Sequence, residues 1–213
     1  MLNEILKIIG TALPALFIGG VFIYIAVQII EISVSLIKFG DSQRRVKKLL
    51  NNALILTSGE RVTVIKFHGH KTVLEYIPYS FLSCQYEAAK KGKQPANQII
   101  YQIPISEHIK FLKNLRNGHI ILDPQHPNPA VSEEAYRLIT AQGEAKGLYF
   151  ILKNSSQKPV GFVSLKKNDD FTEDDFKIMS DLAVNLIPFV ESWDDRKVKT
   201  GIGHFLFPGK QLY

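Results

Sequence analysis

Residues 147–166 read GLYFILKNSSQKPVGFVSLK and contain the clearest secondary-structure pattern in the chain. Two runs rich in aromatic and β-branched side chains, 147–153 and 160–166, flank the polar segment NSSQKP (154–159). Such runs on either side of a turn-forming segment predict a β-hairpin. The stretch therefore predicts the clearest pair of antiparallel strands in the chain.

The next segment, FTEDDFKIMSDLAVNLIPFVE (171–191), predicts a long amphipathic helix. Thr172 is the expected N-cap, and Asp175 stands three residues further on, where a capping box places its second side chain. An apolar stripe at helical spacing follows, so one face of the helix should pack on the sheet. The members of this stripe are Phe176, Met179, Leu182, Ala183, Leu186, Phe189 and Val190. Pro188 inside the stripe predicts a kink or an early end.

Strand and helix patterns also alternate in the residues before this stretch. The predicted strands are 61–67, 72–77, 81–87 and 119–124, of which the first two should form a hairpin, and the predicted helices are 106–117 and a further one from Ser132. Ser106 is a candidate N-cap, Gly118 can end its helix, and 88–98 has the composition of a loop. Strands interrupted and flanked by helices indicate an α+β domain with one mixed or antiparallel sheet.

The N-terminal part of the chain has a different character. Residues 8–30, IIGTALPALFIGGVFIYIAVQII, contain no charge, and at about 1.5 Å per residue they are long enough to cross a hydrocarbon core of roughly 30 Å. A secretory signal peptide is the competing interpretation, but its apolar region spans only about 7 to 15 residues. The run therefore predicts a single transmembrane anchor over residues 1–38, continued by a linker helix over 39–56.

Basic residues on one side of this run predict its orientation. They are Lys38, Arg44, Arg45, Lys47 and Lys48, whereas only Lys7 and the amino terminus precede the run. Because Lys and Arg next to a span favour the cytoplasmic side, the N-terminus should lie outside and the following domain in the cytoplasm. The expected location is an inner or cytoplasmic membrane, where the basic cluster can contact anionic lipid head groups. A lone Cys84 agrees with a reducing compartment.

The formal net charge of +6 does not indicate a nucleic-acid partner. Much of the excess lies in the cluster next to the predicted anchor, and Lys90, Lys91 and Lys93 fall in a predicted loop. The sequence contains no RNA-binding aromatic motif, helix-turn-helix or zinc-finger spacing. We therefore expect no nucleic acid among the partners.

The strand, turn, strand and long helix over 147–192 resemble the C-terminal signature of the GAF family, through the strand 160–165 and the helix start at 171–175. The related PAS-like sensor folds are the alternative. The resemblance implies a cytoplasmic GAF-like domain over 57–192, followed by a basic and aromatic tail, 193–213. It also implies a ligand pocket between the sheet and the segments from 88 to 135, and a dimer interface built from the helices at the two ends of the domain.

Departures from the family's better-known members narrow this expectation. Cys84 stands in no recognisable chromophore-attachment motif, the NKFDE motif of cyclic-nucleotide-binding members is missing, and one cysteine cannot supply methionine sulfoxide reductase chemistry. The sequence also lacks a P-loop and a G-x-S-x-G nucleophile motif. We therefore expect no catalytic residues and no enzyme activity, and the sequence does not identify a cofactor.

The candidate pocket residues are Asp123, which ends a predicted strand, together with Tyr86 and His119. His68 and His70 flank a turn glycine, but zinc-site spacing is absent, so no metal site is expected. A turn-initiating role for Asp123 and a polar turn for the two histidines remain the alternatives.

Three residues near the predicted anchor are candidates for helix packing or membrane function. Ala15 and Gly19 have the small-xxx-small spacing of packed transmembrane helices, and Glu31 is a carboxylate next to an apolar run. If the span is 8–30, Glu31 lies at the interface.

The sequence thus predicts a membrane-anchored sensory or scaffold protein, expected to be a homodimer, whose GAF-like domain binds a small ligand or a protein partner. It is expected to signal through dimerisation or the membrane helix. Because only 21 residues follow Ser192, output is expected through the membrane helix, self-association or a separate partner. The alternative is a membrane effector, of the lesion-forming or channel-forming type of phage lysis or defence, regulated by its soluble domain. A structural subunit of a membrane complex is the third interpretation.

Overall fold

The computed structural model describes the backbone of residues 2–69, 77, 79–129, 131, 133, 136 and 145–190, and the side chains of these residues except 2–20, 22, 32 and 35–39. The chain divides into two compact units, Met1–Arg45 and Val46–Tyr213. The predicted tail, 193–213, lies outside the described residues.

The first unit consists of one helix, α1 (Leu2–Leu56), whose last turns belong to the second unit. Among the described residues, no helix combines the length and the apolar character that a membrane crossing requires. The predicted anchor run, 8–30, falls largely on side chains outside that part of the chain.

The second unit is built on a six-stranded sheet in which every neighbouring pair is antiparallel. Its strands are β1 (Arg61–His68), β2 (Phe81–Ala89), β3 (Ile103–Pro104), β4 (His119–Leu122), β5 (Lys146–Lys153) and β6 (Pro159–Lys167). They lie in the order β3-β2-β1-β6-β5-β4, so β1 and β6 occupy the centre. The predicted α+β class is therefore confirmed, with an antiparallel sheet.

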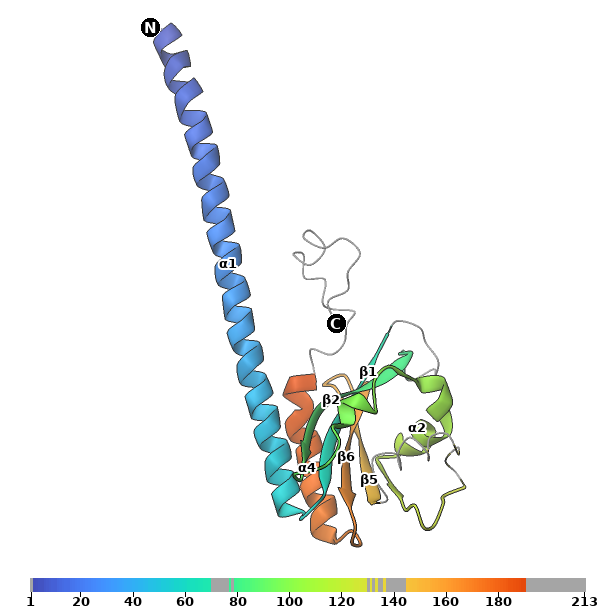
Figure 1. Ribbon diagram of the computed structural model, residues 1–213. Coiled ribbons are helices and arrows are strands. Elements are labelled where there is room, and N and C mark those ends of the chain that lie inside the picture. The colour runs from blue at the N-terminus through green and yellow to red at the C-terminus, as the bar shows by residue number, and fades with distance from the viewer. Residues whose placement is uncertain are drawn as a thin grey trace. The chain divides into compact units, whose positions relative to one another are not determined.

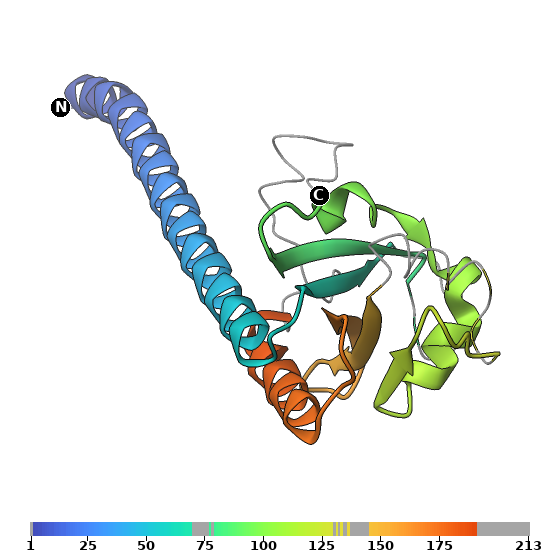
Figure 2. The same ribbon diagram turned by 60° about the horizontal axis from the view of Figure 1, so that its bottom comes forward.

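Helices pack against both faces of this sheet, as Figures 1 and 2 show. The end of α1 and the long helix α4 (Glu173–Val190) cover one face, which we call the α4 face. The short helix α2 (Ile109–Leu115) lies against the other, which we call the α2 face. The 3-10 helices η1 (Ala96–Gln98) and η2 (Ile105–His108) precede α2.

Two apolar cores follow from this layering. On the α4 face, the buried helix residues are Val46, Leu50 and Ala53 of α1 and Met179, Leu182, Leu186 and Val190 of α4. They pack on strand residues such as Val62 and Val163. On the α2 face, Phe111, Leu112 and Leu115 of α2 share a core with strand residues such as Phe67. The sheet therefore separates two cores, and its central strands contribute to both.

The predicted C-terminal stretch is confirmed in its main features. β5 and β6 form the expected hairpin, and α4 begins with the expected capping box. The amide of Asp175 donates to Thr172 Oγ1 at 3.3 Å, and the amide of Thr172 donates to Asp175 Oδ2 at 2.9 Å. The buried Asp175 also accepts a hydrogen bond from Lys167 Nζ at 2.9 Å, which joins the start of α4 to the end of β6. The helix continues past Pro188 to Val190.

The predicted hairpin between 61–67 and 72–77 is wrong. β1 is bonded on one side to β2 and on the other to β6, so neither of its edges is open to a strand that follows directly. The β-branched residues of 72–77 gave a strand pattern, but long-range pairing determined the neighbours of β1. Residues 70–76 themselves lie outside the described part of the chain.

Two helix predictions have different outcomes. The helix expected from Ser106 begins as the α-helix α2 only at Ile109, after a 3-10 turn, and Ser106 makes no cap there. Gly118 does follow its end, with φ of +127°, a conformation that glycine adopts without strain. Most of the helix expected from Ser132 lies outside the described residues.

Gly161 is required by the central position of β6. A Cβ atom at this position would overlap the carbonyl oxygen of Ile65 on β1. Because β6 is held on both sides, by β1 and β5, the backbone has little freedom to move away.

We therefore expect Gly161→Ala to lower the free energy of unfolding by roughly 1–3 kcal/mol, as overpacking of a tight interior does. Gly40→Ala is the control, since a Cβ at Gly40 meets no atom within 4 Å. Urea denaturation of the full chain, followed by near-ultraviolet circular dichroism, measures both. An unchanged midpoint for Gly161→Ala would contradict the tight β1–β6 contact.

Candidate functional site

Four polar residues of the two central strands lie on the α2 face: Arg61 and Thr63 of β1, and Ser164 and Lys166 of β6. All four are buried. Successive side chains of a strand point to opposite faces, and Ile65 and its alternate neighbours belong to the α2-side core. An apolar layer would be the ordinary solution here, so a buried polar group on this face marks a candidate site.

The strand register aligns these residues with β5. Arg61 is opposite Lys166, which is opposite Gly147, and in the next row Thr63 is opposite Ser164, which is opposite Tyr149. We call Arg61, Thr63, Glu87, Tyr149, Ser164 and Lys166 the polar row, because they cross four neighbouring strands at one end of the sheet.

Arg61 ties the polar row to the loop after β2. Its Nε lies 3.1 Å from Glu87 Oε1, and its Nη2 donates to the carbonyl oxygen of Gln94 at 2.5 Å. The other carboxylate oxygen of Glu87 accepts from the amide of Ala96 at 2.8 Å. The remaining nitrogen, Arg61 Nη1, is buried and has no hydrogen-bond partner among the described residues. Such a group is costly to bury unless something else binds it.

Tyr149 brings a second buried polar atom to the same place. Its ring folds over Gly147, where any side chain would overlap the phenol. The hydroxyl group is buried and has no hydrogen-bond partner among the described residues, and burial raises the pKa of this phenol well above its usual range. Gly147 thus makes room for a phenol that a larger residue would displace.

Lys166 lies between these two groups, on the strand between β1 and β5. Its Nζ is 5.6 Å from the centre of the Tyr149 ring, and its side chain is almost fully buried. Burial, with a smaller contribution from the charge of Arg61, lowers the pKa of Lys166 to about 7. The ammonium form is therefore disfavoured by its surroundings and would be stabilised by any anion placed next to it.

Next to the polar row, aromatic rings fill the α2 face. Phe111 packs edge to face on Tyr149 and on Phe162, with centroid distances of 5.3 and 5.5 Å. Phe67 lies 6.0 Å from Phe162. The polar row is thus bordered by a packed aromatic layer.

Asp123 and its contacts lie beyond the end of β4. Asp123 Oδ1 accepts from the amide of Gln125 at 2.9 Å, and Oδ2 lies 3.1 Å from His126 Nδ1 and 3.5 Å from Lys146 Nζ. The Gln125 hydrogen bond, with His126 and Lys146 adding to it, lowers the pKa of Asp123. Lys146 also pairs with Asp170, just before α4. Asp123 therefore organises a turn.

The structure does not bring the three sequence-predicted pocket residues together. Tyr86 packs with the α4-side core, so it lies on the face opposite the polar row. His119 stacks on Phe150 and meets Phe176 of α4 edge to face, with centroid distances of 5.3 and 5.2 Å. Asp123 follows the α2-facing Leu122, close to Tyr136, whose phenol pKa is raised by burial and by the Asp123 charge.

Among the described residues, the histidines and the cysteine form no further candidate site. His68 hydrogen-bonds Ser83 Oγ at 2.8 Å and stacks on Phe81, while His70 lies outside the described residues. Three or more metal-ligating side chains do not gather anywhere in the part of the chain that was described. Burial raises the pKa of the Cys84 thiol to about 12, so the thiolate nucleophile is strongly disfavoured.

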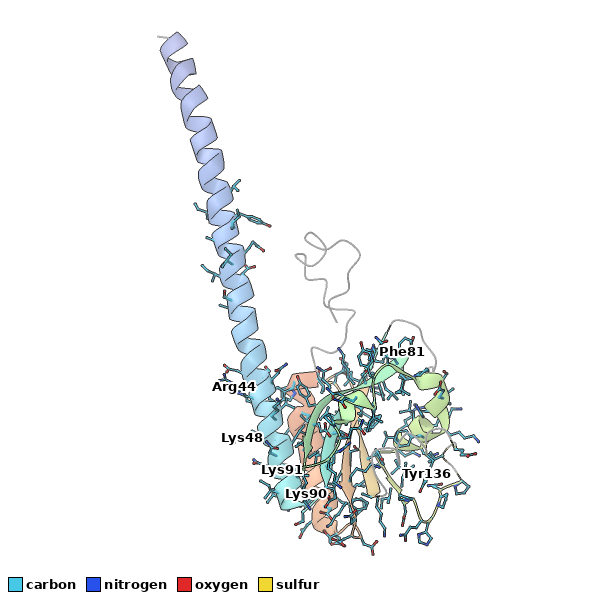
Figure 3. The ribbon with its side chains drawn as sticks, in the orientation of Figure 1. Arg44, Lys48, Phe81, Lys90, Lys91 and Tyr136 are labelled. Atoms are coloured by element: carbon cyan, nitrogen blue, oxygen red, sulfur yellow. The ribbon has the colours of Figure 1, made fainter. Side chains whose placement is uncertain are left out.

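The predicted membrane-proximal residues are placed only in part. Arg44, Arg45, Lys47 and Lys48 are exposed on α1, where Figure 3 labels the first and the last of them, and Glu31 is exposed further along the helix. The side chains of Ala15, Gly19 and Lys38 lie outside the described residues.

The sequence interpretation missed Arg61, Tyr149 and Lys166. Arg61 and Lys166 stand near strand ends, where a charge ordinarily marks the passage to solvent, and Tyr149 fits any buried strand. The sequence did carry one signal, because polar residues occupy alternate positions in both strands and therefore share one face. Arg61 and Thr63 alternate with valines in β1, and Ser164 and Lys166 alternate with Val163 and Leu165 in β6.

Solved structures with the same architecture are GAF domains. The blue-light-absorbing form of the Thermosynechococcus elongatus PixJ GAF domain has a TM-score of 0.55 and 14% identity, over 79% of this chain and 95% of that one. GAF3 from Slr1393 of Synechocystis sp. PCC6803, in its photoproduct state, gives 0.51 and 13%, over 71% and 94%. The chromophore-binding domain of the bacteriophytochrome RpBphP3 from R. palustris gives 0.52 and 12%, over 75% and 63%.

These likenesses show that the chain has a GAF-domain fold. The sequence itself matches no protein-family model and no curated protein. The identities are low, so the shared feature is the arrangement of sheet and helices.

The buried Lys166 generates a prediction about pH. A lysine whose pKa falls to about 7 on folding binds fewer protons in the folded than in the unfolded chain between pH 7 and its ordinary pKa. The loss of folding stability caused by burying the charged Lys166 is therefore complete below pH 7, and it disappears as the pH rises toward about 10.5. We expect Lys166→Met to raise the free energy of unfolding by roughly a few kcal/mol at pH 6 and by much less at pH 10.

Urea denaturation of the full chain at a series of pH values measures this difference. Lys91→Met is the matched control, since Lys91 is exposed and its replacement should change little at any pH. A gain for Lys166→Met that does not depend on pH would show that Lys166 carries no charge penalty in the folded state.

Proposed function

We propose that this protein is a membrane-anchored sensory or scaffold protein whose GAF-like domain binds a small ligand or a protein partner. In this proposal the domain acts by binding and passes the signal to its helices, to self-association or to a partner. The polar row is the ligand site.

One observation carries the proposal: the same two strands serve both faces of the sheet. In β1, Arg61 belongs to the polar row while Val62 packs against the helices, and in β6, Lys166 and Leu165 divide in the same way. Helix α4 and the end of α1 both pack in this core on the α4 face. A ligand at the polar row would therefore shift strands on which both helices rest, and it would bias their arrangement by its differential affinity for the two states.

Binding rather than catalysis is supported by the chemistry of the row. Its two aliphatic hydroxyl groups, on Thr63 and Ser164, hydrogen-bond to each other at 2.5 Å. A nucleophilic hydroxyl needs an adjacent base that is available to accept its proton. Glu87, the carboxylate opposite Thr63, is instead engaged by Arg61 Nε and by the amide of Ala96. The pair is therefore arranged for structure or for ligand contact.

The membrane anchor is supported by α1 and by its sequence. Between residues 21 and 34, exposed apolar side chains occur around the whole circumference of the helix. They are Val21, Ile23, Tyr24, Ile25, Val27, Ile29, Ile30 and Val34. A helix that is apolar all round needs an apolar environment, and the uncharged run 8–30 supplies the length of a span. The exposed bases from Arg44 to Lys48 favour an orientation with the domain in the cytoplasm, next to anionic lipids.

A homodimer is part of the same proposal. Ile55 and Leu56 at the end of α1 and Val184 on α4 are large apolar side chains that are more than half exposed. Their burial against a second copy would remove this surface from water. Sedimentation of the full chain measures the oligomeric state, and a monomer at all concentrations would exclude this part.

Ligand binding should stabilise the domain and move its helices. The full chain in lipid nanodiscs is screened by thermal unfolding against nucleotides and metabolites, and captured proteins are identified in parallel. A ligand at 100 times its Kd should stabilise the fold by about 2.7 kcal/mol. The same ligand should change the distance between spin labels at Lys48 and Lys177, whereas a control pair within α4, at Asp174 and Asp181, should stay fixed. If the full chain binds neither a ligand in the screen nor a protein partner, the proposal is wrong.

Membrane attachment is tested by replacing Ile18 with arginine, because a charge at the centre of a span costs about 2.5–3.5 kcal/mol. The unaltered chain should stay in the membrane fraction during alkaline extraction, and Ile18→Arg should reduce that fraction. Ile55→Arg, outside the run, is the control. Release of the unaltered chain would contradict the anchor, and dye leakage from liposomes would favour the effector alternative.

A further inference from the structure

Three buried polar atoms of the polar row lack hydrogen-bond partners among the described residues. One is Glu87 Oε1, an acceptor that lies 3.1 Å from Arg61 Nε in an ion pair. The other two are donors suited to an anion. They are Arg61 Nη1 and the hydroxyl group of Tyr149. Arg61 and Tyr149 are each only 2% exposed, so water does not replace the missing partner freely. An orphaned donor in the interior costs about 1–3 kcal/mol, and more when it is charged.

The two donors come from strands on either side of β6. Arg61 lies opposite Lys166, Lys166 lies opposite Gly147, and the Tyr149 phenol lies over Gly147. The Lys166 ammonium group is near the Tyr149 ring, 5.6 Å from its centre. Arg61, Lys166 and Tyr149 thus lie on three neighbouring strands at one end of the sheet.

The carboxylate of this cluster is already engaged. Glu87 is the carboxylate in contact with Arg61, and its two oxygens are already engaged by Arg61 Nε and by the amide of Ala96. Lys166 adds a buried amino group beside Arg61. An anionic group placed between Arg61 and Tyr149 would satisfy these two orphaned donors, and it would also stabilise the ammonium form of the nearby Lys166.

We propose that the polar row binds the carboxylate or phosphate group of a small anionic ligand, through Arg61 Nη1, the Lys166 ammonium group and the Tyr149 hydroxyl group. This inference rests on the ligand-binding function proposed above and specifies its chemistry. Aromatic packing between Phe67, Phe111, Tyr149 and Phe162 fills the neighbouring part of the α2 face. The ligand is therefore a compact anion, far smaller than a tetrapyrrole chromophore.

The test uses the full chain in nanodiscs made only of zwitterionic lipid. Titration calorimetry and thermal unfolding are measured with inorganic phosphate and with succinate, at an ionic strength held constant with sodium chloride. The neutral analogue succinamide is the ligand control. A second set of nanodiscs, with phosphatidic acid, tells an anion from solution from a lipid head group, because head-group binding would block the titration with phosphate.

Two variants address the site itself. Lys166→Met should weaken binding of phosphate or succinate at least about tenfold, since it removes a charge-assisted contact. Tyr149→Phe removes only the hydroxyl group, so it should weaken binding about two- to tenfold without lowering the unfolding temperature of the free chain. Lys91→Met is the control for a lysine on the surface and should bind as the unaltered chain does.

Saturable binding of either anion that both variants weaken would support the inference. Equal stabilisation by succinamide or sodium chloride, or unchanged affinity in Tyr149→Phe, would overturn it. If a neutral metabolite from the screen binds and moves the helices while neither anion binds, this inference fails and the proposed function stands. If the anions bind at the polar row but the labelled helices stay fixed, the anion site stands and the signalling proposal fails.

Discussion

The antiparallel pairing of β1 with β6 organises the whole sheet and the cores on its two faces. It places two strands that are distant in the sequence at the centre of the sheet. On one side β2 and then β3 extend the sheet from β1, and on the other side β5 and then β4 extend it from β6. The close approach at Gly161 and the hydrogen bond between Thr63 and Ser164 belong to this one pairing. The core on the α4 face and the polar row on the α2 face are built on the same two strands. A change in the arrangement of one therefore changes the other.

Local patterns in the sequence were sufficient for the C-terminal half of the fold. The turn NSSQKP, the apolar stripe of α4 and the capping box of Thr172 and Asp175 all act over a few residues, so each can be recognised without knowledge of the rest. The pairing of β1 was not accessible in this way. Its neighbours are chosen by long-range contacts, and the nearby pattern at 72–77 suggested a local partner that the structure does not use.

The candidate site was harder to predict than the fold for a related reason. Asp123 was singled out because a polar residue at a strand end is conspicuous, and it organises a turn. Arg61 and Lys166 can be recognised as a pair of buried charged residues only once the strand register places them opposite each other. Tyr149 can be recognised only once Gly147 is seen to leave room for its ring. Burial of a charge is a property of the assembled sheet, so a single sequence gives little sign of it.

The sequence distance across the central pairing has a consequence for synthesis. Thr63 and Ser164 are 101 residues apart, so β1 leaves the ribosome long before its partner β6 has been made. During that interval the valines and isoleucine of β1 have only β2 as a neighbouring strand from the earlier part of the sheet. Unpaired strand edges favour aggregation, and non-local pairing is slow. A nascent chain of this protein is therefore most exposed to misfolding just before its last hairpin emerges.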